Sequence, residues 1–165
     1  MFVRTAEAED EKFLWAMLFE ASYARSQGMV SPDDLREVPT LVRYVHGFGA
    51  PGDLGVVGGS DGVLLGAAWL RLHDRANAGY GFVDDATPEL SIGVAPESRG
   101  TGLGTALMSE LLEHARVTYP AVSLSVRLEN PARRLYQRLG FTDVPATEHI
   151  NRGGTTSVTM LLRFT

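Results

Sequence analysis

A glycine-rich loop between a strand pattern and a helix pattern constrains the fold of this chain more than any other feature. Residues 99–104 read Arg-Gly-Thr-Gly-Leu-Gly, and they follow the apolar, β-compatible run Glu89–Val94. A helix is expected over about Gly102–Thr118, because four leucines recur along one face of it, namely Leu103, Leu107, Leu111 and Leu112. A helix start presents free backbone N–H groups and a partial positive charge, and glycines let the backbone approach an anion closely. The loop therefore predicts a phosphate site, to which Arg99 can add a charge-assisted contact.

Two familiar nucleotide-binding loops do not match this segment. The P-loop pattern GxxxxGK[ST] needs a lysine, and none lies in or near residues 99–104. The dinucleotide pattern GxGxxG needs a third glycine where Thr105 or Leu107 stands, depending on which glycine starts it. The predicted phosphate site belongs to neither class.

The other segments alternate between strand and helix patterns. We expect strands at Phe2–Thr5, Leu54–Val57, Val63–Leu72, Val122–Val126, from Phe141 onward and at Thr155–Arg163. Helices are expected at Ala6–Arg25, from a Ser31 cap to about His46, and from an Asn130-Pro131 cap to Gly140. Gly58–Gly62 is expected to be a hairpin turn, and the polar segment Asp74–Thr87 a mobile loop. Hairpins mixed with helices favour an α+β fold, and 165 residues predict a single domain over residues 1–165.

Composition excludes several function classes. The chain has no cysteine, which excludes a disulfide scaffold, a thiolate metal site and a cysteine nucleophile. A net charge of −5 disfavours nucleic-acid binding as the main role. We expect no membrane span and a cytoplasmic location, because long apolar runs and a signal-peptide pattern are absent. The four histidines have no metal-ligand spacing, so no metal is expected; they are His46, His73, His114 and His149.

A second segment adds to the loop. Residues 130–141 read Asn-Pro-Ala-Arg-Arg-Leu-Tyr-Gln-Arg-Leu-Gly-Phe, and they follow the loop after room for one helix and one strand. Together the two segments resemble the GNAT superfamily of N-acetyltransferases, whose signature is a Q/R-x-x-G-x-G/A loop between a splayed strand and a helix. Arg99, Gly102 and Gly104 match that signature. The resemblance implies the GNAT fold, a mixed and mostly antiparallel central sheet of about six to seven strands flanked by about four helices.

The resemblance also implies how acetyl-CoA, the cosubstrate, is bound. The pyrophosphate is expected on backbone amides of the loop and the first helical turn, at Arg99, Gly100, Thr101, Gly102, Leu103, Gly104 and Thr105. The pantetheine arm is expected on the backbone of Ile92, Gly93 and Val94, mainly through Ile92 and Val94.

Two details of the cofactor site stay open at this point. Arg133 or Arg138 is implied at the adenosine phosphate, and the alternative is that both are solvated helix arginines. Asn130 precedes Tyr136 by six residues, whereas many family members show seven, where Glu129 stands. Either Asn130 or Glu129 can therefore face the pantetheine, and Asn130 can equally be only a helix cap.

Acetyl transfer to an amine needs a neutral amine, a donor for the oxyanion and a way to stabilise the leaving thiolate. By resemblance, Glu89 is the base, acting through water, with a surface carboxylate at a strand end as the alternative. Asp84 and Asp85 are reserve candidates for the base. The N–H of Val94 is the implied oxyanion donor. Tyr136 is the implied acid for the thiolate, with a half-buried structural tyrosine as the alternative.

We therefore expect an N-acetyltransferase that moves an acetyl group from acetyl-CoA to a primary amine of a small molecule, peptide or protein. Direct attack in a ternary complex is expected, since no cysteine is present to form an acetyl-enzyme. The alternative is a non-catalytic acyl-CoA-binding or sensing module, which would need neither Glu89 nor Tyr136. Dimers are common with this fold, and a homodimer is compatible with the sequence.

The acceptor pocket is less constrained by the sequence. Trp15, Phe19 and Tyr23 lie on the first expected helix and can border such a pocket, although packing in the core is the alternative. Acidic residues near the implied pocket favour a cationic small amine; they are Glu20, Asp84, Asp85 and Glu89.

Overall fold

The computed structural model describes residues 1–165, and one sheet of eight strands runs through its centre. The strands are β1 (Phe2–Thr5), β2 (Leu54–Ser60), β3 (Val63–Arg71), β4 (Glu89–Val94), β5 (Ala121–Arg127), β6 (Thr142–Asp143), β7 (His149–Ile150) and β8 (Thr156–Arg163). Their order in the sheet is β1-β2-β3-β4-β5-β8-β6, and β7 also pairs with β8. All pairs are antiparallel except β4 with β5. The expected α+β class and mostly antiparallel sheet are confirmed, and the two strands β6 and β7 have only two residues each.

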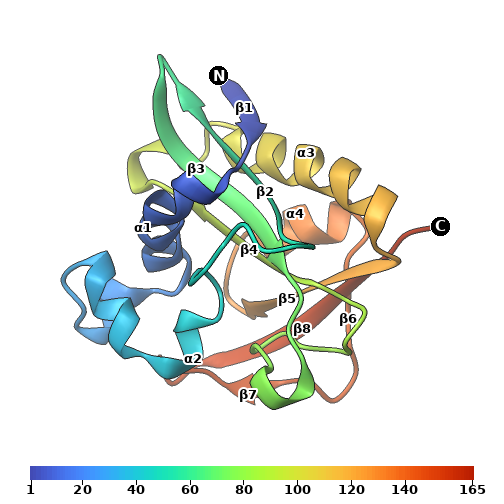
Figure 1. Cartoon of the computed structure of the whole chain (residues 1–165). Helices are drawn as coiled ribbons and strands as arrows, with labels where there is room; N and C mark the ends of the chain where they lie inside the picture. Colours follow the sequence, from blue (N-terminus) through green and yellow to red (C-terminus); the bar gives the residue numbers. More distant parts are fainter.

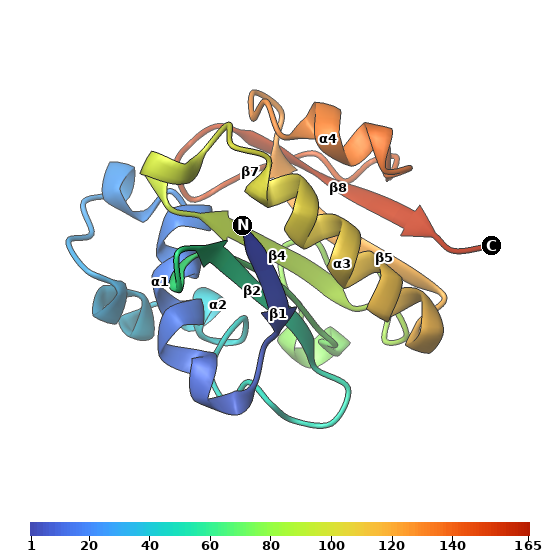
Figure 2. The same ribbon diagram turned by 90° about the horizontal axis from the view of Figure 1, so that it is seen from above.

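Helices cover both faces of this sheet. They are α1 (Glu11–Ala21), α2 (Pro39–Val42), α3 (Leu103–Thr118) and α4 (Arg133–Arg138), with short 3-10 turns at Ala8–Asp10, Ala24–Gln27, Pro32–Glu37, Arg75–Asn77 and Pro96–Ser98. Figure 1 shows the helices around the sheet, and Figure 2 shows α1 and α2 on one side of it and α3 and α4 on the other. None of these helices combines the length and the apolar character needed to cross a membrane.

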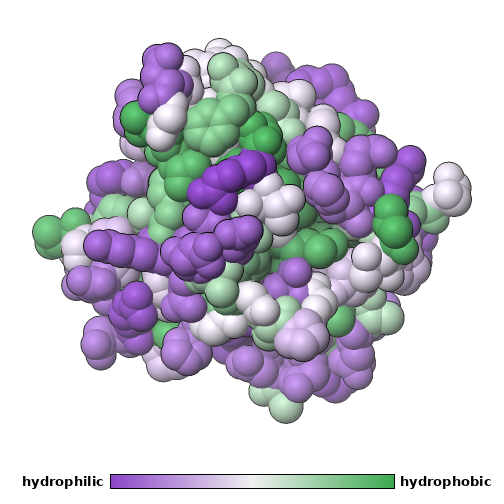
Figure 3. Space-filling model, turned by 45° about the horizontal axis from the view of Figure 1, so that its top comes forward, coloured by the Kyte–Doolittle hydropathy of each residue, from purple (hydrophilic) through white to green (hydrophobic).

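The two faces of the sheet contribute to two separate apolar cores. Successive side chains of a strand point to opposite faces. On β3, Ala68 and Leu70 accordingly join the core under α3, whereas Ala67 and Trp69 join the core under α1. Polar side chains cover most of the surface seen in Figure 3, and apolar residues reach it only in small areas. The same alternation on β4 sends Leu90 toward α3, so its neighbour Glu89 faces the side of α1 and α2.

The segment before β2 departs most from the sequence expectation. The helix expected from Ser31 to about His46 is broken into a 3-10 turn, Pro32–Glu37, and the four residues of α2. The Ser31 cap is present as a capping box with Asp34. Pro39 explains the break, because a proline lacks an N–H and pushes the residue before it out of the helical region. Val38 is indeed extended, with φ −108° and ψ 99°.

The first helix and the first hairpin also differ from their expected bounds. α1 ends at Ala21, and Tyr23 adopts a left-handed φ of 57°, which stops the helix short of the expected Arg25. Gly58 and Gly59 belong to β2, so the β2–β3 turn consists of Asp61 and Gly62 alone. Both turn residues have positive φ, 52° and 75°, as a two-residue hairpin of the primed type requires.

Candidate active site

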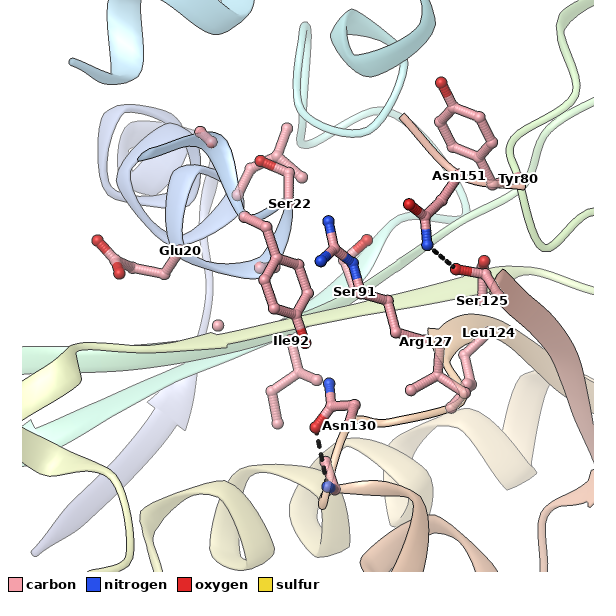
Figure 4. Close-up of a pocket in the computed structure, with 18 of the residues that line it drawn as sticks. Glu20, Ser22, Tyr80, Ser91, Ile92, Leu124, Ser125, Arg127, Asn130 and Asn151 are labelled. Atoms are coloured by element: carbon pink, nitrogen blue, oxygen red, sulfur yellow. Dashed lines mark hydrogen bonds between the residues drawn. The ribbon is translucent and has the colours of Figure 1, made fainter. Parts of the chain in front are cut away.

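The parallel pair at the centre of the sheet comes apart after a single register position. Glu89 of β4 lies opposite Ser123 of β5, and the Ser123 N–H donates to the Pro88 carbonyl at 3.0 Å. Beyond this point the strands diverge around a cavity of about 790 Å³, to which Ile92 and Val94 contribute from β4 and Ser125 and Arg127 from β5. Figure 4 shows residues of both strands at this gap, with Ser91 and Ile92 on β4 and Leu124, Ser125 and Arg127 on β5. The split leaves unpaired strand edges inside the protein.

Hydrogen-bond register decides which backbone groups of β4 face the cavity. Ala95 lies opposite Leu65 in the β3–β4 register, and its N–H donates to the Leu65 carbonyl at 2.7 Å. Bonded and non-bonded pairs alternate along an antiparallel ladder. Gly93 and Ser91 therefore bond to β3, whereas the N–H and C=O groups of Ile92 and Val94 point toward β5. These are the two residues that the sequence resemblance assigned to the pantetheine arm.

Gly93, between them, has a packing role. A Cβ at Gly93 would lie 2.2 Å from the Met17 carbonyl oxygen of α1. Only glycine lets the helix backbone approach β4 this closely. Gly93 thus fixes α1 against the strand that borders the cavity.

The glycine loop lies at one end of the cavity, before α3. Gly100 and Gly102 have left-handed φ values of 76° and 89°, and a Cβ at either position would meet nothing within 4 Å. Arg99, Gly100 and Gly104 line the cavity, whereas Thr101, Gly102, Leu103 and Thr105 do not. Leu103 is buried in the core under α3, and the Thr101 hydroxyl donates to the Ser98 carbonyl at 2.6 Å. The expected loop is therefore in place, with part of it presented to the cavity.

Charge at this end of the cavity is positive. The Glu20 carboxylate is paired with Arg25 at 2.7 Å and with Arg99 at 3.4 Å. Asp84 and Asp85 are exposed and do not line the cavity. Of the four acidic residues expected around the acceptor pocket, Glu20 and Glu89 line this cavity, with Glu20 paired to two arginines, and Asp84 and Asp85 do not.

Glu89 is buried, with 5% of its surface exposed. Its Oε2 accepts a hydrogen bond from the Tyr44 hydroxyl at 2.7 Å, and that hydroxyl accepts one from the Tyr80 N–H at 2.8 Å. Oε1 has no hydrogen-bond partner of normal geometry and lies against Gly79, where a Cβ would be 2.1 Å from it. Burial raises the pKa of Glu89 to about 7, against the opposite effect of hydrogen bonds from Tyr44 and the Gly81 amide. Such a carboxyl group exchanges a proton near neutral pH, which a surface carboxylate does not.

Tyr136 of α4 also lines the cavity and is buried, with 6% exposed. Its ring packs against Phe141 at 6.1 Å between centroids. Burial, together with the neighbouring Tyr23, raises the pKa of Tyr136 to about 12. The phenol therefore stays protonated at neutral pH and is a hydrogen-bond donor.

The structure shows which of the two residues, Asn130 or Glu129, borders the cavity. Asn130 lines the cavity, and its Oδ1 accepts the Ala132 N–H at 2.9 Å, as the dashed line in Figure 4 marks. Glu129 does not line the cavity, and its side chain is 55% exposed. Asn130 thus caps the turn before α4 and borders the cavity at the same time.

Neither arginine considered for the adenosine phosphate lines the cavity. Arg133 forms a two-pronged pair with Asp143, with both N–O distances at 3.2 Å. Arg138 is exposed on α4. A contact between Arg133 and a phosphate would require the Asp143 pair to open.

Several cavity residues carry no signal that sequence reasoning used. Tyr44 lies in the broken segment after α2, which has no periodic pattern, and Tyr80 lies in the loop before β4. Arg127 continues the alternation of Ser123 and Ser125 on β5, and this period-two pattern would have placed it on the face of Glu89. Of the aromatic residues expected at the acceptor pocket, Phe19 and Tyr23 line the cavity and Trp15 is packed in the core. Histidine, aspartate and glutamate residues form no cluster able to hold a metal ion.

Comparison with known proteins identifies the family. Residues 14–141 match the model of the acetyltransferase (GNAT) family. A mycothiol acetyltransferase of Actinosynnema mirum is 37% identical over 123 residues, which cover 73% of this chain and 37% of the relative. One from Streptomyces griseus is 31% identical over 144 residues, covering 85% of this chain and 42% of the relative. The chain thus spans about two-fifths of the length of these relatives.

Solved structures share the fold. A ribosomal-protein-alanine N-acetyltransferase from Brucella melitensis superimposes with a TM-score of 0.70 at 19% identity, over 99% of this chain and 100% of that one. The yncA protein of Salmonella typhimurium, solved with its cofactor acetyl-CoA, gives a TM-score of 0.69 at 21% identity, over 100% of this chain and 94% of that one. Since the family model and the relatives each match most of its length, the chain belongs to the acetyltransferase (GNAT) family, whose members are acyltransferases with acetyl-CoA as cosubstrate.

Proposed function

We propose that this chain transfers the acetyl group of acetyl-CoA to a primary amine by direct attack in a ternary complex formed in the β4–β5 cavity. One observation carries the proposal. The same cavity holds a buried carboxyl group that titrates near neutral pH, Glu89, and a buried phenol that stays protonated, Tyr136. Those are the two proton-handling groups that amine attack and thiolate departure need.

The residues present fit acetyl-CoA. The pyrophosphate would lie on the backbone of the loop 99–104, where the left-handed glycines leave open space, and Arg99 would add a charge. Thr101 would contribute its backbone only, since its hydroxyl is held by Ser98. The pantetheine arm would bond to the free backbone groups of Ile92 and Val94, as a third strand would. The thioester would then lie near the point where β4 and β5 separate.

Glu89 would receive the proton of the attacking amine. Its Oε2 is held by the Tyr44 hydroxyl, so Oε1 is the free acceptor atom. Because the carboxyl group is nearly inaccessible, the proton would reach it through water. As the new C–N bond forms, the N–H of Val94 would donate to the oxyanion.

Tyr136 would stabilise the leaving sulfur when the C–S bond breaks. A thiol has an ordinary pKa of about 8.5, well below the value of about 12 for this phenol. Tyr136 would therefore donate a hydrogen bond to the thiolate rather than lose its proton to it at equilibrium. The phenol is suited to that task because its hydroxyl forms no hydrogen bond with another protein group.

The acceptor is proposed to be a small-molecule amine. The mycothiol acetyltransferases among the relatives are named for a small molecule, but they are more than twice as long as this chain. Their acceptor is therefore not carried over. A peptide or protein amine is the other class to be tested.

The test is the release of CoA measured with a thiol reagent. The chain has no cysteine, so all thiol detected comes from CoA. We expect release that depends on added amine, and at least a tenfold lower kcat in Tyr136→Phe with little change in acetyl-CoA affinity. Equal kcat in this variant and the wild type would refute the role of Tyr136. Binding of acetyl-CoA without release for any amine would favour a non-catalytic acyl-CoA-binding module.

A further inference from the structure

Four arginines line the cavity, and three of them have protein partners. Arg25 and Arg99 share the carboxylate of Glu20, and Arg152 donates to the side-chain oxygen of Gln27. The fourth, Arg127, is the last residue of β5. Figure 4 shows its side chain extending into the cavity between Ser22 and Asn151.

Arg127 is nearly buried but has no close anion. Its side chain is 14% exposed, and the nearest carboxylate, on the exposed Glu129, is 4.0 Å away. No group of the protein accepts a hydrogen bond from its guanidinium. Two other arginines of similar burial are fully paired: Arg71, at 14%, bonds to Asp53 and two backbone carbonyls, and Arg133, at 17%, forks onto Asp143. Arg127 is therefore a partly buried cation whose one ion pair in the protein is long, and whose N–H groups have no acceptor in the protein.

Its neighbours hold the guanidinium in place without using its donors. The guanidinium carbon lies 3.6 Å from the centre of the Tyr23 ring. Tyr23 has the left-handed φ of 57°, an unfavourable conformation for a tyrosine that the surrounding structure maintains. Gly153 also lies against the guanidinium, because a Cβ there would be 2.5 Å from Nη2. The fork is thus oriented in advance, with its N–H groups left for a ligand.

Arg127 lies on the acceptor side of the cavity. Along β5, Leu124 and Val126 enter the core under α3, so Ser125 and Arg127 point to the opposite face. Glu89, the proposed proton acceptor, is on that face too, with Tyr44. Glu89 lies opposite Ser123, so Arg127 lies further along β5, in the direction in which β4 runs toward Val94 and the glycine loop. An amine that delivers its proton toward Glu89 through water would therefore meet Arg127 with the far end of the same molecule.

We propose that Arg127 determines acceptor specificity by binding an anionic group, a carboxylate or a phosphate, on the amine that is acetylated. A guanidinium fork matches the two oxygens of either group. The acceptor is then an amine that also carries an anionic group, and not the cationic amine that the acidic residues in the sequence favoured. This inference rests on the proposed acetyl transfer.

Matched pairs of amines test it. The carboxylate pair is β-alanine and β-alaninamide, and the phosphate pair is O-phosphoethanolamine and ethanolamine. Wild type should prefer the anionic member of at least one pair by tenfold or more in kcat/KM. Arg127→Gln should reduce that preference about tenfold or more and keep the turnover of the neutral amine. The pair that responds tells carboxylate from phosphate.

Controls make the result specific. Arg134→Gln changes an exposed arginine outside the cavity and should leave both preferences unchanged. Arg127→Lys keeps the positive charge but not the two-pronged guanidinium, so it should show an intermediate preference for the anionic amine. This variant can also replace Arg127→Gln if that protein folds poorly. Unchanged preferences in both Arg127 variants would overturn the proposal. So would weaker CoA binding in these variants with unchanged preferences, because Arg127 would then serve the cosubstrate.

A binding measurement separates this proposal from the proposed function. Thermal unfolding is followed with CoA present and each of the four amines added. We expect an anionic amine to stabilise wild type but not Arg127→Gln. If an anionic amine stabilises wild type but no amine is acetylated, the proposed acetyl transfer is refuted and the proposed anion site at Arg127 is supported. If neutral amines are acetylated but the anionic amines neither stabilise wild type nor react faster, the proposed acetyl transfer is supported and the proposed anion site is refuted.

Discussion

At the scale of single residues, Glu89 shows how burial gives a common side chain an uncommon proton affinity. The face of β4 on which Glu89 lies follows from the alternation of side chains along a strand, and this alternation can be read from the sequence. Its burial does not, because Tyr44 and Gly79, which enclose the carboxyl group, come from segments without a periodic pattern. The family resemblance could therefore suggest Glu89 as a base, which stays a prediction, but the sequence could not show that burial raises the pKa of this group to about 7.

Glu89→Gln should remove the pH dependence that this carboxyl group causes. The wild-type rate should rise with pH through about 7 as Glu89 loses its proton, in addition to the rise caused by deprotonation of the amine itself. The variant should lose the inflection near pH 7 and about 100-fold in kcat. A pH–rate profile with an amine of known pKa measures both effects. Glu113→Gln, at an exposed carboxylate on α3, is the matched control and should change neither.

The same substitution should change stability with a defined sign. The native pKa of Glu89 is raised above 4.5, so its contribution to stability is complete at low pH and is lost as the pH rises to about 7. The free energy of unfolding of Glu89→Gln should therefore rise by about 3 kcal/mol relative to that of wild type between pH 4.5 and pH 8. Urea unfolding at these two pH values measures the gain. No relative gain would mean that the carboxyl group is not desolvated in the native state.

Tyr44 is expected to act as a positioning residue for Glu89. Its hydrogen bond favours the ionised carboxylate, so Tyr44→Phe should move the inflection of the pH–rate profile above 7 and lower the rate at neutral pH. Tyr119→Phe is the control, since that hydroxyl bonds to the Gly52 carbonyl and does not contact Glu89. An inflection that stays in place in Tyr44→Phe would contradict the positioning role.

At the scale of elements, the segments with strong local signals have the expected structure. Helix α3 and strand β4 have the bounds expected from the sequence to within a residue, because leucine spacing and an apolar run define them. α2 does not, because Pro39 interrupts the pattern in a way that periodicity alone does not show. The divergence of β4 and β5 is likewise invisible locally, since it depends on the pairing of residues far apart in the chain.

Two glycines with similar positive φ values and open space around the Cβ position, one inside the loop and one outside it, allow a controlled test of the loop. Gly100 in the loop and Gly62 in the β2–β3 turn have φ values of 76° and 75°, and a Cβ at either would meet nothing within 4 Å. Alanine at each should cost about 1–2 kcal/mol of stability through backbone strain. Only Gly100→Ala, at the residue that lines the cavity, should also weaken CoA binding, by severalfold, as calorimetric titration would measure. Equal CoA affinity in both variants would place the phosphates elsewhere.

At the scale of the whole molecule, the sheet separates two groups of candidate site residues. The face of α3 and α4 carries the glycine loop and Tyr136, whereas the face of α1 and α2 carries Glu89, Tyr44 and the guanidinium of Arg127. The β4–β5 split is the passage between them. The α+β fold and the family follow from the loop and the segment after β5. The proposed acceptor face depends on tertiary contacts of segments without motifs, so the sequence alone placed Asp84 and Asp85 near a cavity that they do not line and did not single out Arg127. A single domain and a homodimer stay predictions.

The measurement that tests this account most directly is thermal unfolding with acetyl-CoA, CoA and ATP in parallel. A ligand at about 100 times its dissociation constant stabilises a protein by about 2.7 kcal/mol, which for a chain of this size is a rise in Tm of about 5–10 °C. We predict that rise with acetyl-CoA and with CoA, and none with ATP, which has phosphates but no pantetheine arm for Ile92 and Val94. No rise with acetyl-CoA at millimolar concentration would contradict the account, because the β4–β5 cavity would then not be a binding site for the cosubstrate.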